Sequence, residues 1–167
     1  MISNDIRARN NVLGTWFALA AILMLFTALT SAYVFRRGLD ADWQAMRAPG
    51  LIFFSTAVLL ASSATLEISR RSARVVRWLV ATGLLGFAFV AGQLLVWNQL
   101  ATAGVRLATT THSSFFYLLT AVHALHLLGG IVALSRCWPG GAAAIALYWH
   151  FLTGLWLYIL VILFVWR

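Results

Sequence analysis

The sequence has little charge and very little acid. Of its 167 residues 10% are charged, whereas a soluble globular domain has about 25%, and its 12 basic residues include no lysine. Four acidic residues leave a net charge of +8. So few charged groups cannot cover a water-facing surface, which excludes a water-soluble enzyme. The same shortage excludes a nucleic-acid-binding domain in spite of the positive charge.

Cysteine and proline are almost absent as well. The single cysteine, Cys137, excludes a secreted fold held by disulfides. The two prolines, Pro49 and Pro139, lie between apolar runs, so no helix is expected to be broken by proline. The chain is instead 62% hydrophobic and 14% aromatic.

Long uncharged windows decide the fold class. A helix needs about 20 apolar residues to cross a bilayer, and lipid requires its backbone groups to be paired within the helix. We therefore predict an all-α integral membrane protein, one membrane domain over residues 1–167. Its five transmembrane helices are expected at about residues 12–35, 51–68, 78–100, 113–134 and 142–166. The first window has 24 uncharged residues, too many for a cleavable signal of about 7 to 15, so we expect it to be retained.

The distribution of arginine predicts the orientation. Seven arginines lie on the side of the N-terminus and five on the other side. Basic residues favour the cytoplasmic side, so we predict a cytoplasmic N-terminus and a periplasmic C-terminus. The densest cluster lies between the second and third helices and could contact lipid headgroups; it comprises Arg70, Arg71, Arg74 and Arg77.

Small residues four positions apart predict where helices approach closely. These pairs are Ala28 and Ala32, Ala57 and Ala61, and Ala88 and Gly92. No acidic residue falls at the middle of a predicted helix, which argues against an ion-coupled transporter. Glu67 lies at a helix end, three and four residues before Arg70 and Arg71, and is expected to pair with them.

Polar side chains deep in the predicted helices are the candidate functional residues. His123 and His126 share a face of the fourth helix, and His126 and His150 each lie eight residues from the loop between the last two helices. Both are therefore expected about 12 Å from the same membrane surface. Tyr148 and Gln93 are the other members of this candidate set, with Tyr117 as a further neighbour, whereas His112 is expected at the membrane surface.

Two interpretations of these histidines compete. Imidazoles on facing helices could ligate a haem or a metal ion, or they could form a structural polar network between helices. No cysteine or carboxylate lies at that depth to complete a metal site, so we favour the network. Deep tryptophans, Trp16 and Trp156, could mark packing against a partner.

The last two helices carry specific motifs. The fourth helix has Phe116-Tyr117, then His123 and His126 spaced by three, and the fifth has the run Tyr148-Trp149-His150-Phe151 with Trp156 beyond it. Both motifs resemble those of subunit III of the haem-copper respiratory oxidases, the cytochrome c oxidase subunit 3 family, in its short five-helix form. Supporting matches in the other helices are Met24 to Phe26 with Ser31 to Tyr33, Ser55-Thr56 with 60–63, and Phe89 with Gln93.

Two departures limit what the resemblance implies. Where the family usually has serine-glutamate in the first of these helices this chain has Ala21-Ile22, and where it has aspartate in the last helix this chain has Thr153. Roles proposed for those acids, including direct proton handling, therefore do not carry over. The short form also lacks two N-terminal helices of the longer members.

The resemblance implies an accessory, non-redox subunit of a bacterial terminal oxidase in the cytoplasmic (inner) membrane, active in aerobic respiratory electron transport coupled to proton translocation. The chain itself would hold no catalytic centre, metal or cofactor except phospholipid, because haem and copper belong to subunits I and II. Subunit I is the expected direct partner, with no nucleic acid. The alternatives are the related subunit of a nitric oxide reductase system and a membrane cytochrome that binds haem through its own histidines.

Overall fold

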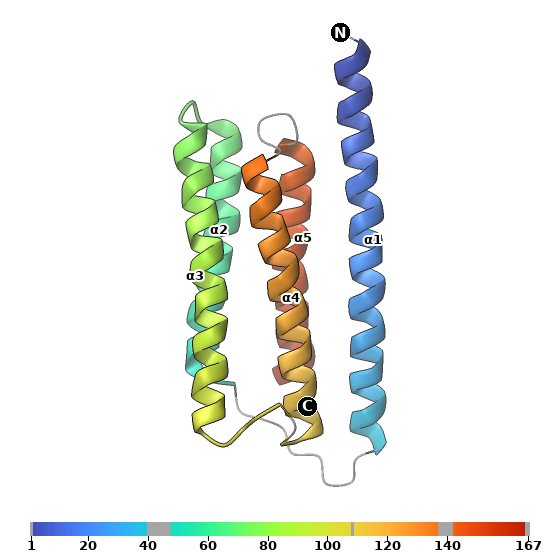
Figure 1. The fold of residues 1–167 in the computed structure, drawn as a ribbon, viewed down its shortest axis with the longest axis vertical. Coiled ribbons are helices and arrows are strands. Elements are labelled where there is room, and N and C mark those ends of the chain that lie inside the picture. Colours follow the sequence, from blue (N-terminus) through green and yellow to red (C-terminus); the bar gives the residue numbers. More distant parts are fainter. Residues whose placement is uncertain (1, 40–47, 108, 137–141, 166–167) are drawn as a thin grey trace.

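The computed structural model describes residues 2–39, 48–107, 109–136 and 142–165, with side chains in the first helix from residue 12 onwards. Cys137 and Pro139 lie outside the described residues. Five helices in this part are long and apolar enough to cross a membrane, which confirms the predicted fold class. They run up and down along one axis (Figure 1).

Except for the last one, the helices extend beyond their predicted spans at both ends. Their bounds are α1 (Ile2–Leu39), α2 (Gly50–Arg71), α3 (Val75–Thr102), α4 (Thr111–Arg136) and α5 (Ala142–Leu160), which continues into a π-helical turn, η1 (Val161–Val165). The extensions carry the basic residues of the last turns, which interact favourably with the helix dipole at a C-terminus.

Local sequence signals explain two helix ends. Pro49 precedes α2 in an extended conformation, and its carbonyl accepts the first bond from the Ile52 N–H. Gly104 closes α3 with a φ of 85°. Its N–H donates to Ala101 O, and the Val105 N–H donates to Leu100 O. This is the Schellman arrangement, which needs a residue in the left-handed region and therefore favours glycine.

The α2–α3 hairpin is joined by hydroxyl groups rather than by the predicted alanine pairs. Ser62 Oγ donates to the Thr82 carbonyl oxygen at 2.9 Å, and the hydroxyls of Thr65 and Thr82 are 2.9 Å apart. A Cβ added to Gly92 would lie 3.1 Å from Ser55 Cβ. The alanine partners point outward, which corrects the prediction; Ala28, Ala32, Ala57, Ala61 and Ala88 are all exposed. Serine and threonine serve here because they are small and also bond across the interface.

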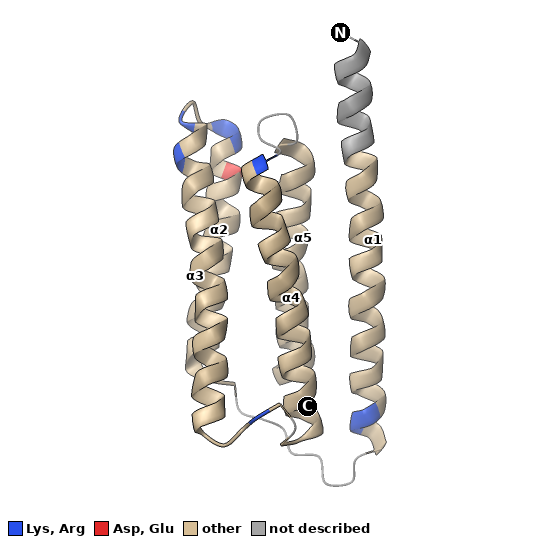
Figure 2. Ribbon diagram, viewed as in Figure 1, with Lys and Arg blue, Asp and Glu red and all other residues tan. Residues whose placement is uncertain are grey.

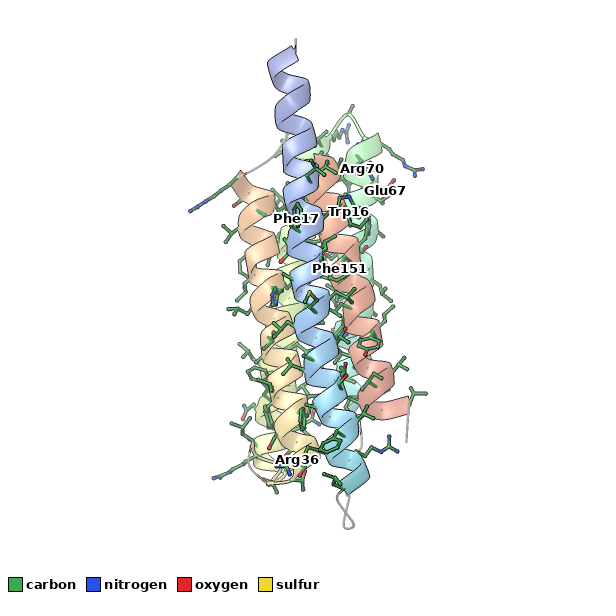
Figure 3. All side chains as sticks on the ribbon, turned by 90° about the vertical axis from the view of Figure 1, so that its right-hand side faces the viewer. Trp16, Phe17, Arg36, Glu67, Arg70 and Phe151 are labelled. Carbon is green, nitrogen blue, oxygen red and sulfur yellow. The ribbon has the colours of Figure 1, made fainter. Side chains whose placement is uncertain are left out.

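Helix α1 lies along one side of the bundle and contacts α4 and α5 (Figure 1). Its inner face buries Phe26 and Tyr33, and Thr30 Oγ1 lies 3.0 Å from the Tyr158 hydroxyl of α5. Its outer face carries Trp16 and Phe17, which are exposed (Figure 3). Trp16 is therefore not buried inside this chain, whereas the other deep tryptophan, Trp156, is.

The centre of the bundle is built around Trp149 of α5. Its indole is fully buried and passes close to two glycines of neighbouring helices. A Cβ on Gly86 of α3 would lie 3.1 Å from the ring, and one on Gly130 of α4 would lie 3.4 Å from it. The two glycines therefore make the space that this large side chain fills.

Candidate functional site in the bundle interior

The three candidate histidines contact three different neighbours. His123 is fully buried in the middle of α4, with its ring 5.1 Å from Trp156 of α5 and 5.8 Å from Phe89 of α3. Phe89 and Trp156 also contact each other edge to face at 5.0 Å. Within the described residues neither ring nitrogen of His123 has a hydrogen-bond partner. The imidazole is thus held by aromatic packing.

His126 lies one turn further along α4 and faces α1. Its Nδ1 is 2.7 Å from the Val122 carbonyl oxygen, and its ring is 5.9 Å from that of Phe26. Because a carbonyl only accepts, this Nδ1 carries the proton. The Tyr148 hydroxyl donates to the His126 carbonyl at 3.0 Å, which joins α5 to α4.

His150 faces α2 instead. Its Nδ1 lies 2.6 Å from Ser63 Oγ, and its Nε2 lies 3.9 Å from a Glu67 carboxylate oxygen. Glu67 pairs with Arg70 at 3.0 Å and with Arg71 at 2.8 Å, in agreement with the expected ion pair. Figure 3 shows Glu67 and Arg70 at the end of the bundle opposite Arg36. Contacts of His150 therefore connect the interface between α5 and α2 with the charged residues at the end of α2.

The structure thus brings Tyr148 and His126 together but does not join the three imidazoles. In the described part of the chain no hydrogen bond links His123, His126 and His150 to one another. Their matched depth along the helices does not produce contact, because each ring leaves its helix in a different direction. No group of three or more His, Cys, Asp or Glu among these residues could hold a metal ion.

Gln93 of α3 contacts a polar layer formed by hydroxyl groups of α2. Its Nε2 donates to Ser55 Oγ at 2.9 Å, while its Oε1 has no hydrogen-bond partner among the described residues. The next residue of α2, Thr56, accepts a hydrogen bond from Trp156 Nε1 at 2.9 Å. Adjacent hydroxyls of α2 therefore tie α3 and α5 to the same point of the bundle.

Sequence reasoning missed this role of the serines of α2. Ser55, Ser62 and Ser69 are all buried and follow one another at intervals of seven residues. Such spacing keeps them on one face of a helix and could have identified the α2 interface.

His112 is the second residue of α4, and its side chain is fully buried within the protein. Its depth relative to the membrane surface stays a prediction. Its Nε2 lies 3.1 Å from the Leu163 carbonyl oxygen, and its ring is 5.9 Å from that of Tyr33 and 6.2 Å from that of Phe164. The π-helical turn shifts the pattern of backbone bonding at the end of α5, and His112 contacts a carbonyl there.

Tyr117 is not near the other candidates, since its hydroxyl donates to the Val105 carbonyl oxygen at 2.9 Å.

The two positions that depart from the oxidase pattern lie inside the bundle. Ile22 is buried in the apolar core on α1. Thr153 is buried on α5, where its Oγ1 donates to the Trp149 carbonyl at 3.0 Å. Isoleucine offers no polar atom, and the threonine hydroxyl is satisfied within its own helix.

Comparison with known proteins places the chain in a family. No protein-family model matches it. A probable cytochrome c oxidase subunit 3 of Nocardia farcinica is 31% identical over 86% of this chain and 82% of its own length. A cytochrome c oxidase subunit 3 of Thermostichus vulcanus is 28% identical over 92% of this chain and 86% of its own length. A cytochrome bo(3) ubiquinol oxidase subunit 3 of Pseudomonas aeruginosa is 26% identical over 93% and 84%, respectively.

These relatives align over 86% to 93% of this chain. With this length of match and this arrangement of spanning helices, the chain belongs to the subunit 3 family of the respiratory oxidases.

Proposed function

We propose that this chain is an accessory subunit III of a bacterial haem-copper terminal oxidase, which packs against the catalytic subunit I and carries no redox centre itself. The observation that carries the proposal is the relationship to oxidase subunit 3 proteins over more than four fifths of both chains. The oxidase as a whole would reduce oxygen and translocate protons, with haem and copper held by subunits I and II.

The surroundings of the histidines support a non-redox role. Ligation of a haem by two imidazoles needs rings that face each other with room for the macrocycle between them. Here the His123 ring lies against Trp156 and Phe89, while His126 and His150 face α1 and α2. Each imidazole thus packs against or bonds to a helix neighbour, as a structural residue would.

The outer surface supports a place among lipids and other membrane subunits. Large apolar side chains are exposed on all five helices. In a membrane such a surface faces acyl chains or apolar neighbours without cost. It would cover part of subunit I and order lipid at the join.

Charge supports the proposed orientation in the inner membrane. Five described arginines lie at the α2–α3 turn and the end of α4, and three lie at the opposite end (Figure 2). Because basic residues favour the cytoplasmic side, the α2–α3 turn and the N-terminus would be cytoplasmic and the C-terminus periplasmic.

The function is tested on the complex from native membranes. Affinity purification through a tag on this chain, followed by native mass spectrometry, should recover it with subunit I and subunit II masses. Absorption spectra should show haem in the complex and no Soret band in the chain purified alone. Stoichiometric haem in the isolated chain, or recovery with a nitric oxide reductase, would contradict the proposal.

His150→Leu should reduce assembly with subunit I without changing its haem spectrum. The substitution removes the bond to Ser63 and leaves Glu67 without its imidazole neighbour, so α5 is held less firmly against α2. The expected loss is about 1 kcal/mol per interhelical bond, read out as a lower yield of the complex. Ser63→Ala removes the same hydrogen bond from the α2 side and should lower the yield by a similar amount. Loss of a haem band from the assembled complex would refute the structural role of His150.

A further inference from the structure

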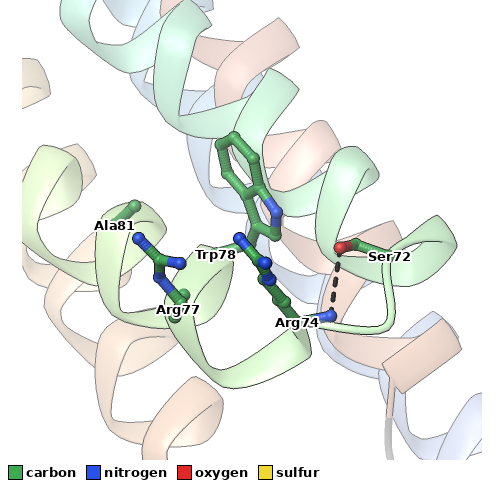
Figure 4. A pocket seen from close by; sticks show the side chains of 5 residues that line it. All are labelled: Ser72, Arg74, Arg77, Trp78 and Ala81. Carbon is green, nitrogen blue, oxygen red and sulfur yellow. Dashed lines mark hydrogen bonds between the residues drawn. The ribbon is translucent and has the colours of Figure 1, made fainter.

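A cavity lies at the α2–α3 turn, where the membrane-spanning parts of both helices end. It has a volume of about 470 Å³ and is lined by Ser72, Arg74, Arg77, Trp78 and Ala81 (Figure 4). The last four follow a spacing of three, four and seven residues, so they share one face at the start of α3. Ser72 Oγ accepts a hydrogen bond from the Arg74 N–H at 3.1 Å, which shapes the turn.

The two arginines of this cavity differ from those that precede them. Glu67 is the only acidic residue whose side chain the structure describes, and it binds Arg70 and Arg71. No ion pair within that part involves Arg74 or Arg77. The cavity therefore presents two positive charges that the bundle itself does not neutralise.

The position of the cavity restricts its ligand. The spanning segment of α2 ends at Arg71 and that of α3 begins at Val75, so the cavity lies at the level of lipid headgroups. Beyond the arginines it is bordered by Trp78, a residue type enriched at this depth of the membrane, and by Ala81. A cavity with arginines at its opening and apolar residues beyond them fits a ligand that has both an anionic group and an apolar part. A soluble anion would use only the arginines.

We propose that Arg74 and Arg77 bind the phosphate of an anionic phospholipid of the phosphatidylglycerol type, with the start of its acyl region against Trp78. Guanidinium groups donate charge-assisted hydrogen bonds to phosphate oxygens. The net negative headgroup is preferred because a zwitterionic one carries its own cation close to the phosphate. All five lining residues belong to this chain, so the isolated chain is expected to bind the lipid.

The test uses the purified full chain in micelles containing either phosphatidylglycerol or phosphatidylcholine, with bound lipid counted by native mass spectrometry across a lipid titration. Arg74→Gln/Arg77→Gln should weaken retention of phosphatidylglycerol about 25-fold, since one basic side chain near an anionic headgroup contributes roughly fivefold. Arg106→Gln/Arg136→Gln removes the same charge outside the cavity and should retain the wild-type affinity. Arg74→Lys/Arg77→Lys, which keeps the charge, should fall between them.

Three results would overturn the proposal. Equal retention of phosphatidylcholine would show that no anionic headgroup is selected. Equal weakening by the control pair would assign the effect to net charge rather than to this cavity. Displacement of the lipid by millimolar inorganic phosphate would make a soluble anion the ligand. Size-exclusion profiles check that each variant stays folded. The single substitution Arg77→Gln, at an exposed side chain, should weaken lipid retention by a smaller factor than the double substitution.

Discussion

Trp149→Ala is expected to lower the free energy of unfolding of the isolated chain by about 3 kcal/mol, within the range for loss of a buried large aromatic side chain. The indole is fully buried between α3 and α4 and fills the space left by Gly86 and Gly130. In lipid no hydrophobic force drives helices together, so packing of this kind is what holds them. The truncated side chain would leave a cavity where three helices meet.

The polar atom of Trp149 reduces that cost slightly. Its Nε1 is buried and has no hydrogen-bond partner among the described residues, so its loss breaks no bond. Trp149→Phe keeps a ring in the space and removes the unpaired N–H, and it should cost about 1 kcal/mol or less.

The measurement is reversible unfolding in mixed dodecylmaltoside and dodecyl sulfate micelles, followed by circular dichroism. Trp16→Ala is the control, because that indole is 56% exposed on the outer face of α1. It should change the unfolding free energy by less than about 0.5 kcal/mol. Equal effects of the two substitutions would mean that the interior tryptophan does not hold the bundle together.

Gly130→Val should destabilise the chain by about 2 kcal/mol more than Gly129→Val, as expected for overpacking. A Cβ at position 130 would lie 3.1 Å from Tyr148 Cε1 and 3.4 Å from the Trp149 ring. Another part of the ring lies close to Gly86, where an added Cβ would be 3.1 Å from it, so the ring packs between two helices. A Cβ at Gly129 meets nothing within 4 Å.

Gly129→Val is a close control for Gly130→Val because the two glycines are neighbours in α4. Both substitutions add the same side chain to the same helix and remove the same backbone freedom, so the difference in unfolding free energy reports packing alone. The same micelle titration measures it. If Gly129→Val proved as destabilising as Gly130→Val in the isolated chain, the close approach of α4 and α5 would be wrong.

Several features could be predicted from the residues before any fold was known. The ion pairs of Glu67 with Arg70 and Arg71 follow from spacing on a helix and are present in the structure. The histidine motifs indicated the oxidase family, which the relatives confirm. A structural role of His123, His126 and His150 stays a prediction, which the His150→Leu experiment addresses for one of them.

One wrong prediction has a clear physical cause. The alanine pairs are predicted to lie at helix interfaces, whereas the structure exposes the alanines. In a water-soluble helix the apolar stripe indicates the inner face. In a membrane the outer face is also apolar, so the pattern of hydrophobic residues does not tell which side of the helix packs against the protein.

The number of membrane-spanning helices and their alternating directions follow from the residues, because lipid admits only long uncharged helices and short links make neighbours alternate. Which polar groups meet depends on the packing in three dimensions, since the rotation of each helix directs His126 to α1, His123 to Trp156 and His150 to α2. Trp149 packs between Gly86 and Gly130, and such shape complementarity between distant segments leaves no periodic signal along the chain.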